Sequence, residues 1–158
     1  MAFFSSMNIV GSGMTAQQAR LDVISENITN MNTTRTEAGG AYRRKITVMQ
    51  AETGKNGFRE AMSRAAVRGH AISNRSRDAY PQAGGVKIVE IAEDDTPNPL
   101  VYDPTHPDAN EEGYLELPNV TLVKEVTDAM AASQAFNANV TAFNALKQVV
   151  QRGLDIGV

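Results

Sequence analysis

The residues that could do chemistry are few and scattered along the chain. The two histidines, His70 and His106, have no nearby serine or acidic pattern that is typical of a catalytic triad or a metal motif. Gly11-Ser12-Gly13 lacks the further glycine of a dinucleotide-binding loop and the lysine of a phosphate-binding loop. The chain has no cysteine, which excludes disulfides, thiol catalysis and zinc–cysteine sites.

Two acidic pairs, Asp94-Asp95 and Glu111-Glu112, are the remaining candidates for ion binding. Neither pair has the alternating oxygen ligands of a calcium loop, so solvated loops are the better interpretation. His106 lies in a proline-containing stretch and is expected to be a turn residue. We therefore predict no catalytic site, no cofactor and no metal, and a protein that is not an enzyme.

Length and composition indicate one elongated unit. A chain of 158 residues predicts roughly one domain, and a hydrophobic content of 42% predicts some core. Aromatic residues make up only 6% and tryptophan is absent, which favours several thin contacts over one compact core. No stretch has the roughly 18 to 20 apolar residues of a membrane span, and the N-terminus lacks the pattern of a cleaved secretory signal.

The net charge of −3 hides a separation of charge along the chain. Residues 43–87 contain ten basic and three acidic residues, whereas residues 88–116 contain nine acidic residues and no basic one. The two blocks could be solvated surfaces that attract each other. They could also be self-complementary faces that steer neighbouring subunits together.

Both ends of the chain carry one apolar stripe at helical spacing. Near the N-terminus, steps of three and four residues connect Met7, Val10, Met14, Gln17, Leu21, Ile24, Ile28 and Met31. Near the C-terminus, the same steps connect Ala129, Ala132, Phe136, Asn139, Phe143, Leu146, Val150 and Gly153. Such heptad steps predict two long helices, over the first thirty residues and over residues 121–152.

The two stripes need a covering partner. They could bury each other in a helical hairpin within one chain, or they could be buried by other copies. Each stripe is interrupted by one amide, Gln17 or Asn139, which could set the register between helices or face solvent.

Local signals predict the ends of the first helix. Ser5 is a plausible N-cap, and the stretch 25–34, rich in Asn, Thr and Ser, is expected to end the helix. Gly11 and Gly13 lie inside it and each cost about 1 kcal/mol relative to alanine. This helix should therefore be marginal by itself.

The second helix has a similar set of signals. Asn119 or Thr121 is expected to cap its start. Glu125 and Asp128 follow within the first turns, where the helix dipole favours acidic side chains. We interpret these two residues as stabilising the helix end.

The segment between the helices predicts short strands. Strands are expected at 41–49, 86–91, 100–102 and 114–117, with turns at Gly39-Gly40 and Gly84-Gly85. Between Glu52 and Gln82 the pattern favours neither a short helix nor a loop. The predicted fold is α+β and mainly α. Long terminal helices pair as a coiled-coil-like domain (residues 1–35 and 119–158) around a small β-rich central module (36–118) with an Arg-rich insert at about 51–80.

Several segments together resemble the flagellar basal-body rod proteins, most closely their proximal-rod members. The resemblance rests on Leu100–Pro104, His106–Asn110, Gly113-Tyr114 and Leu117–Val120, and continues into Glu125-Val126, Met130, Ala132-Ser133 and Ala138-Asn139. Ser25–Asn30 is similar to the Asn-rich motif that closes the family's first helix, with Thr29 where alanine is usual. Tyr42–Lys45 and Gly84–Val86 are similar to its middle strands. The resemblance does not cover residues 51–80.

The resemblance implies a structural subunit of the bacterial flagellar basal body. Rod proteins pair their terminal helices into a domain that lines an axial tube, and are exported by the flagellar type III apparatus without a cleaved signal. The partners implied are further copies, FlgB- and FlgF-like rod proteins, a FliE-like base adaptor and the export apparatus. An open tube needs heterologous contacts that repeat without closing.

The assembly interface is expected on the two stripes and on the Asn-rich motif. Its predicted residues are Met7, Val10, Met14, Leu21, Ile24, Asn27, Ile28, Asn30, Phe136, Asn139, Phe143, Leu146 and Val150. We further hypothesise that the first helix stays largely unfolded until assembly buries its stripe.

Two functions of other classes remain open from the residues. One is a helical adaptor or export-chaperone-like protein, which would hold a partner helix with the same stripes and stay monomeric or dimeric. The other is a nucleic-acid-binding module that would use Arg59, Arg64, Arg68, Arg75 and Arg77 and would bind less tightly as salt rises. The absence of interleaved aromatics disfavours the second.

Overall fold

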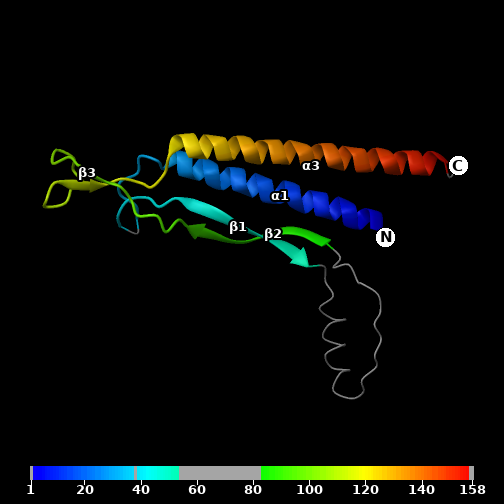
Figure 1. Ribbon diagram of the computed structural model, residues 1–158, viewed down its shortest axis with the longest axis horizontal. Helices are drawn as coiled ribbons and strands as arrows, with labels where there is room; N and C mark the ends of the chain where they lie inside the picture. Colours follow the sequence, from blue (N-terminus) through cyan, green and yellow to red (C-terminus); the bar gives the residue numbers. More distant parts are fainter. Residues whose placement is uncertain (1, 38, 54–82, 157–158) are drawn as a thin grey trace, which may run out of the picture.

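The computed structural model describes residues 2–37, 39–53 and 83–156. Two long helices, α1 (Ala2–Thr29) and α3 (Leu122–Ile156), lie side by side and antiparallel, with both chain ends at the same end of the molecule (Figure 1). A hairpin of β1 (Lys45–Thr53) and β2 (Ala83–Glu93) packs on α1. The elongated α+β fold predicted from the sequence is confirmed.

The apolar stripes of α1 and α3 face each other within one chain. Gly13 of α1 lies directly against Asn139 of α3, and a Cβ added at this glycine would be 3.0 Å from the Asn139 amide nitrogen. The Oε1 atom of Gln17 is buried and has no hydrogen-bond partner among the described residues. Gly13 therefore allows close approach of the two helices as well as weakening α1.

The ends of the helices agree only in part with the prediction. Ser5 is not an N-cap, because α1 already begins at Ala2. The helix ends at Thr29, inside the Asn- and Thr-rich stretch as predicted. Thr121 occupies the N-cap position of α3, where its carbonyl accepts a hydrogen bond from the Glu125 N–H at 3.1 Å. Asn119 does not cap this helix but binds the backbone of Arg44, just before β1, and of Thr96, after β2.

The first hairpin corrects the predicted turn at Gly84-Gly85. Both glycines lie within β2, which pairs antiparallel with β1 and carries a bulge opposite Val48 and Met49. Gly85 has φ +97°, and a Cβ there would lie 2.2 Å from the Ser12 Oγ. The glycine lets the strand approach α1 so closely that the Val86 N–H donates to the Ser12 Oγ. At Gly39-Gly40 the predicted turn is confirmed, with φ of +86° and +80°.

A second, smaller hairpin lies at the far end of the molecule from the chain termini (Figure 1). It consists of β3 (Leu100–Tyr102) and β4 (Tyr114–Glu116), paired so that Tyr102 lies opposite Tyr114. Both strands match the prediction, except that the last strand ends at Glu116 rather than Leu117.

The apolar core is thin. Its buried members are mostly small or come from the end of α1 that lies near the hairpins: Ala16, Val23, Ile24, Ala41, Tyr42, Leu115 and Ala132. Within the described ranges no helix is long and apolar enough to cross a membrane. The Arg-rich insert predicted at about 51–80 begins inside β1, which includes residues 51–53. Its remaining residues, with the five arginines of the nucleic-acid hypothesis, lie outside the described residues.

Gly85→Ala should destabilise the protein by about 2–4 kcal/mol, because the new Cβ meets Ser12 and the left-handed φ strains any L side chain. Gly11→Ala is the matched control. It adds a Cβ in open space within a helix and should stabilise by about 1 kcal/mol. Urea unfolding followed by circular dichroism measures both. Equal effects of the two variants would contradict the tight contact.

Candidate functional site

Arg44 is the centre of a polar junction that joins three parts of the chain. Its Nε donates to the Glu125 Oε1 at 2.6 Å, and its terminal nitrogens lie 3.1 Å from Asp128 on α3 and 3.5 Å from Asp94 after β2. Burial lowers the pKa of the Arg44 guanidinium, but hydrogen bonding and the charge of Glu125, together with Asp128 and Asp94, outweigh it and raise the pKa. The guanidinium therefore stays charged.

Glu125 and Asn27 are the most deeply buried polar side chains of the described chain, with exposed fractions of 0% and 1%. The Asn27 amide donates to the Glu125 Oε2 at 3.1 Å and to the Lys45 carbonyl at 2.9 Å. Its carbonyl oxygen accepts from the Tyr42 hydroxyl at 3.0 Å and from the Lys45 N–H at 2.9 Å. All four hydrogen bonds of this amide are therefore made, which is what its burial requires.

The backbone around Arg44 is held from both sides. Its N–H donates to the Asn119 Oδ1 at 2.7 Å, and its carbonyl accepts from the Asp94 N–H at 2.8 Å. The Asn119 amide also donates to the Thr96 carbonyl at 2.9 Å. Asn119 thus connects the start of β1 to the connector after β2, which explains why it is not free to cap α3.

The junction is not apparent from the sequence, because the residues that form it lie far apart along the chain. Glu125 and Asp128 were expected to interact only with the helix dipole, and Asn27 was expected at an assembly interface. One signal could have found the junction. Glu125 lies four residues before Ala129, in phase with the apolar seam, and an acid in a buried seam needs a cationic partner.

The predicted assembly residues occupy two different environments. Ile24 and Asn27 are buried inside the chain, and Asn30 closes α1 by donating to the Glu26 carbonyl at 3.0 Å. The others lie along the facing sides of α1 and α3 and keep part of their surface exposed: Met7, Val10, Met14, Leu21, Ile28, Phe136, Asn139, Phe143, Leu146 and Val150. The two stripes therefore cover each other incompletely.

A further apolar face, not predicted from the sequence, lies on the outer side of α3. Val123, Val126 and Met130 follow each other at spacings of three and four residues and are exposed, Val123 by 75% and Met130 by 69%. Val149 and Leu154 are also exposed near the C-terminal end. Large apolar side chains gathered on one exposed helix face are typical of protein–protein contact.

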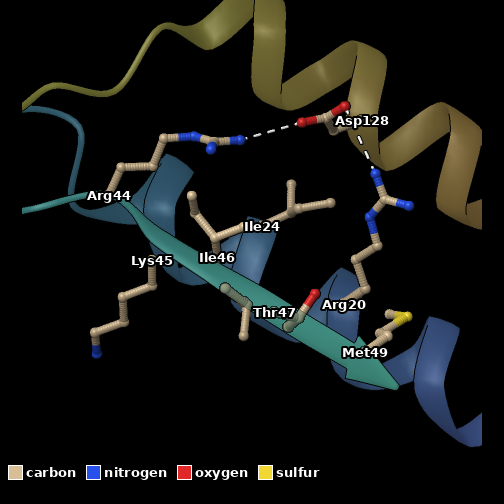
Figure 2. A pocket seen from close by; sticks show the side chains of 9 residues that line it. Arg20, Ile24, Arg44, Lys45, Ile46, Thr47, Met49 and Asp128 are labelled. Carbon is tan, nitrogen blue, oxygen red and sulfur yellow. Dashed lines mark hydrogen bonds and ion pairs between the residues drawn. The ribbon is translucent and has the colours of Figure 1, made fainter. Parts of the chain in front are cut away.

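An open pocket of about 210 Å³ lies between α1, α3 and the start of β1 (Figure 2). Val23, Ile24, Ile46 and Met49 are its apolar lining. Asp128 lies at its edge between Arg44 and Arg20, and the Arg20 guanidinium is 3.7 Å from the carboxylate of Asp128. The pocket combines an apolar floor with charged lining residues, which are three cations (Arg20, Arg44 and Lys45) and one acid, Asp128.

The described residues contain no cluster of three or more histidine and acidic side chains that could hold a metal ion. The His106 Nδ1 accepts a hydrogen bond from the Asp108 N–H at 3.2 Å and lies in the loop between β3 and β4, so this histidine is a turn residue. The described chain has a buried polar junction and several exposed apolar surfaces. These exposed surfaces suit the binding of other proteins.

Comparison with known proteins shows similarity to flagellar basal-body rod proteins at both ends and along the length of the chain. Residues 7–35 match the family model described as flagella basal body rod protein, and residues 111–156 match the model of the flagellar basal body rod FlgEFG protein C-terminal. The flagellar basal-body rod protein FlgC of Bacillus subtilis is 41% identical over 99% of both chains. FlgC of Borreliella burgdorferi is 39% identical, over 99% of this chain and 98% of the relative. FlgC of Escherichia coli is 32% identical over 99% of both.

The Tyr42 hydroxyl provides a pH test of the junction. Burial, followed by the nearby charges of Glu26, Glu125 and Glu93, raises the pKa of Tyr42 from 10.0 to about 12. Between these two pH values the unfolded chain loses the proton while the folded chain keeps it. The stability that Tyr42 contributes should therefore be complete below pH 10 and be lost as pH rises towards 12.

Urea unfolding measured from pH 9 to 12 on the wild type and on Tyr42→Phe checks this. The variant should be less stable at pH 9, because it lacks the hydrogen bond to Asn27, and its stability should fall less steeply with pH. An identical slope in both proteins would contradict the assignment.

Proposed function

The chain belongs to the FlgC family of flagellar basal-body rod proteins and is a structural rod subunit of the basal body, and we propose that it polymerises into the proximal rod through the exposed faces of its two terminal helices. In this role it would transmit torque and line the export channel. Such work needs repeated binding surfaces and no catalytic residue.

The observation that carries the proposal is the apolar outer face of α3. Val123, Val126 and Met130 would each gain at most roughly 1.5–3 kcal/mol on burial against a neighbour, and the described chain leaves a large part of each exposed. The partly exposed stripes of α1 and α3 add a second surface that neighbours could complete. Because these two surfaces differ, they suit heterologous contacts that continue along an open helical assembly.

Residues 1–35 and 119–158 form the proposed assembly domain, with the segment 36–118 facing outward. The polar junction would keep these two parts in one orientation under load, because Arg44 at the start of β1 bonds to Glu125 and Asp128 on α3. Stiffness at this point is what a torque-bearing subunit needs.

The half of α1 before Ala16 is the part that we expect to be least stable in the isolated chain and to gain most stability on assembly. Among its described side chains none is fully buried, whereas Ala16, Val23, Ile24 and Asn27 bury the second half within the chain. Local stability follows burial. This narrows the hypothesis of folding on assembly from the whole helix to its first half.

The proposed partners are further copies of the chain, FlgB- and FlgF-like rod proteins and a FliE-like base adaptor. We also propose export through the flagellar type III apparatus without a cleaved signal. The intact mass of the subunit isolated from basal bodies tests the last point, because removal of a leader would shorten the chain.

Met130→Lys should block incorporation into the rod while leaving the fold intact, because it places a charge in the apolar outer face of α3. Loss of one buried contact worth about 1.4 kcal/mol lowers incorporation about tenfold. Ala131→Lys is the control: Ala131 is also exposed on α3 but points about 100° away around the helix.

Each variant is expressed in a strain from which its own FlgC has been deleted. We then measure how much of the variant is present in isolated basal bodies and how well the cells swim. We expect the control to assemble normally and Met130→Lys to fail with an unchanged melting temperature. Normal assembly of Met130→Lys would rule out this face as an interface.

A further inference from the structure

The β3–β4 hairpin carries an exposed aromatic face that no other element of the described chain covers. Leu100 and Tyr102 of β3 lie opposite Glu116 and Tyr114 of β4, and these four residues, here called the tyrosine knob, share one face of the hairpin. Leu100 is 67% and Tyr102 64% exposed, while Leu115 on the opposite face is buried. Two of the four tyrosines in the chain are therefore exposed at one tip.

Contacts within the hairpin hold the tyrosine knob in place. The Tyr102 and Tyr114 rings pack edge to face with centroids 5.3 Å apart. Gly113, with φ +80°, leaves room for the Tyr102 ring, since a Cβ there would lie 2.9 Å from it. The Asn110 Oδ1 accepts from the Tyr114 N–H at 2.8 Å and the Glu112 N–H at 3.0 Å, which fixes the turn. Such preorganisation lowers the entropy cost of binding.

The pocket of Figure 2 has the complementary properties. Its volume of about 210 Å³ exceeds the roughly 150 Å³ of an apolar protein cavity that holds a benzene ring. Ile24, Ile46 and Met49 offer apolar contacts. Among the described residues Arg20 makes one long ion pair, with Asp128, which leaves most of its five N–H donors available to an acidic partner.

The charges of the two surfaces also match. The tyrosine knob includes Glu116, which makes no ion pair within the described ranges, and it lies in the block of residues 88–116 that has nine acidic and no basic residues. The pocket presents Arg20 to solvent. The knob lies beyond the helix ends, at the far end of the molecule from the chain termini, and contacts neither α1 nor β1 (Figure 1). It can therefore fill this pocket only in another molecule.

We propose that the tyrosine knob of one copy inserts Tyr102 into the Arg20 pocket of the next copy, with Glu116 paired to Arg20. This contact deepens the proposed rod function and rests on it. It is heterologous, because knob and pocket are different surfaces, so each copy can bind one neighbour with its knob and another with its pocket. Repetition gives an open chain of copies rather than a closed dimer.

Cysteine cross-linking tests the contact directly, because the chain has no cysteine of its own. Leu100→Cys places a thiol on the knob and Thr47→Cys places one at the pocket. A chain carrying both should form a ladder of disulfide-linked multimers on mild oxidation, both in concentrated solution and in isolated basal bodies. A mixture of the two single variants should stop at the dimer, since each pair of copies then has only one possible bond.

A second experiment reverses the two charges, Glu116 and Arg20, that the proposal pairs. Glu116→Arg, added to the two-cysteine chain, should reduce the ladder about tenfold, and the further change Arg20→Glu should restore it. Circular dichroism of each variant establishes that it is folded. Glu112→Lys, which changes an exposed acid on the adjacent turn, is the control and should leave the ladder unchanged.

The outcomes separate this proposal from the rod function. If the two-cysteine chain is incorporated into basal bodies but forms no ladder, or if its pocket thiol cross-links only to a rod protein of another mass, the knob-and-pocket contact is wrong and the rod function stands. If a folded wild-type chain is absent from basal bodies, the rod function itself is wrong. A dimer formed by Leu100→Cys alone would indicate a symmetric contact and would also overturn the proposal.

Discussion

The buried ion pair between Arg44 and Glu125 is the interaction on which the arrangement of the chain depends. A carboxylate with no exposed surface is costly to desolvate, and only a well-placed cation with further hydrogen bonds offsets the cost. Arg44 supplies the cation, and Asn27 supplies the second hydrogen bond to the same carboxylate. These three residues come from the start of β1, from α3 and from α1, so the pair can form only when all three elements are in place.

This dependence gives the two ends of the molecule different properties. The end at the junction is held by buried contacts, whereas the end with the chain termini has few of them. Around the junction, Val23, Ile24, Tyr42 and Ala132 are buried and complete a small core. Towards the chain termini the helices cover each other only in part, and beside the junction Val123, Val126 and Met130 stay exposed on the outer side of α3. An ordinary globular protein would bury such surface within its own chain. A rod subunit can leave it for its neighbours.

Much of this architecture could be predicted from residue spacing, because helices and short strands follow from local periodicity. Steps of three and four residues identified both helices, and alternation with turn signals identified the strands. The failures were contacts between distant segments. Gly84-Gly85 looked like a turn, yet Gly85 serves close approach to Ser12, which lies 73 positions earlier. Glu125 looked like a helix-dipole residue, because its partner Arg44 is 81 positions away. No local pattern reports such pairings.

Hydrogen exchange resolved by segment, on the isolated wild-type chain and on Glu125→Gln, tests the central role of the junction most directly. The account predicts that residues 16–29, 41–52 and 122–132 lose protection together in the variant, by roughly a hundredfold, the equivalent of about 3 kcal/mol for an unpaired buried charge. Asp128→Asn, which removes a partly exposed partner of Arg44, should change protection far less. Loss of protection confined to the first turn of α3, with α1 and β1 unchanged, would contradict the claim that this pair joins the three elements.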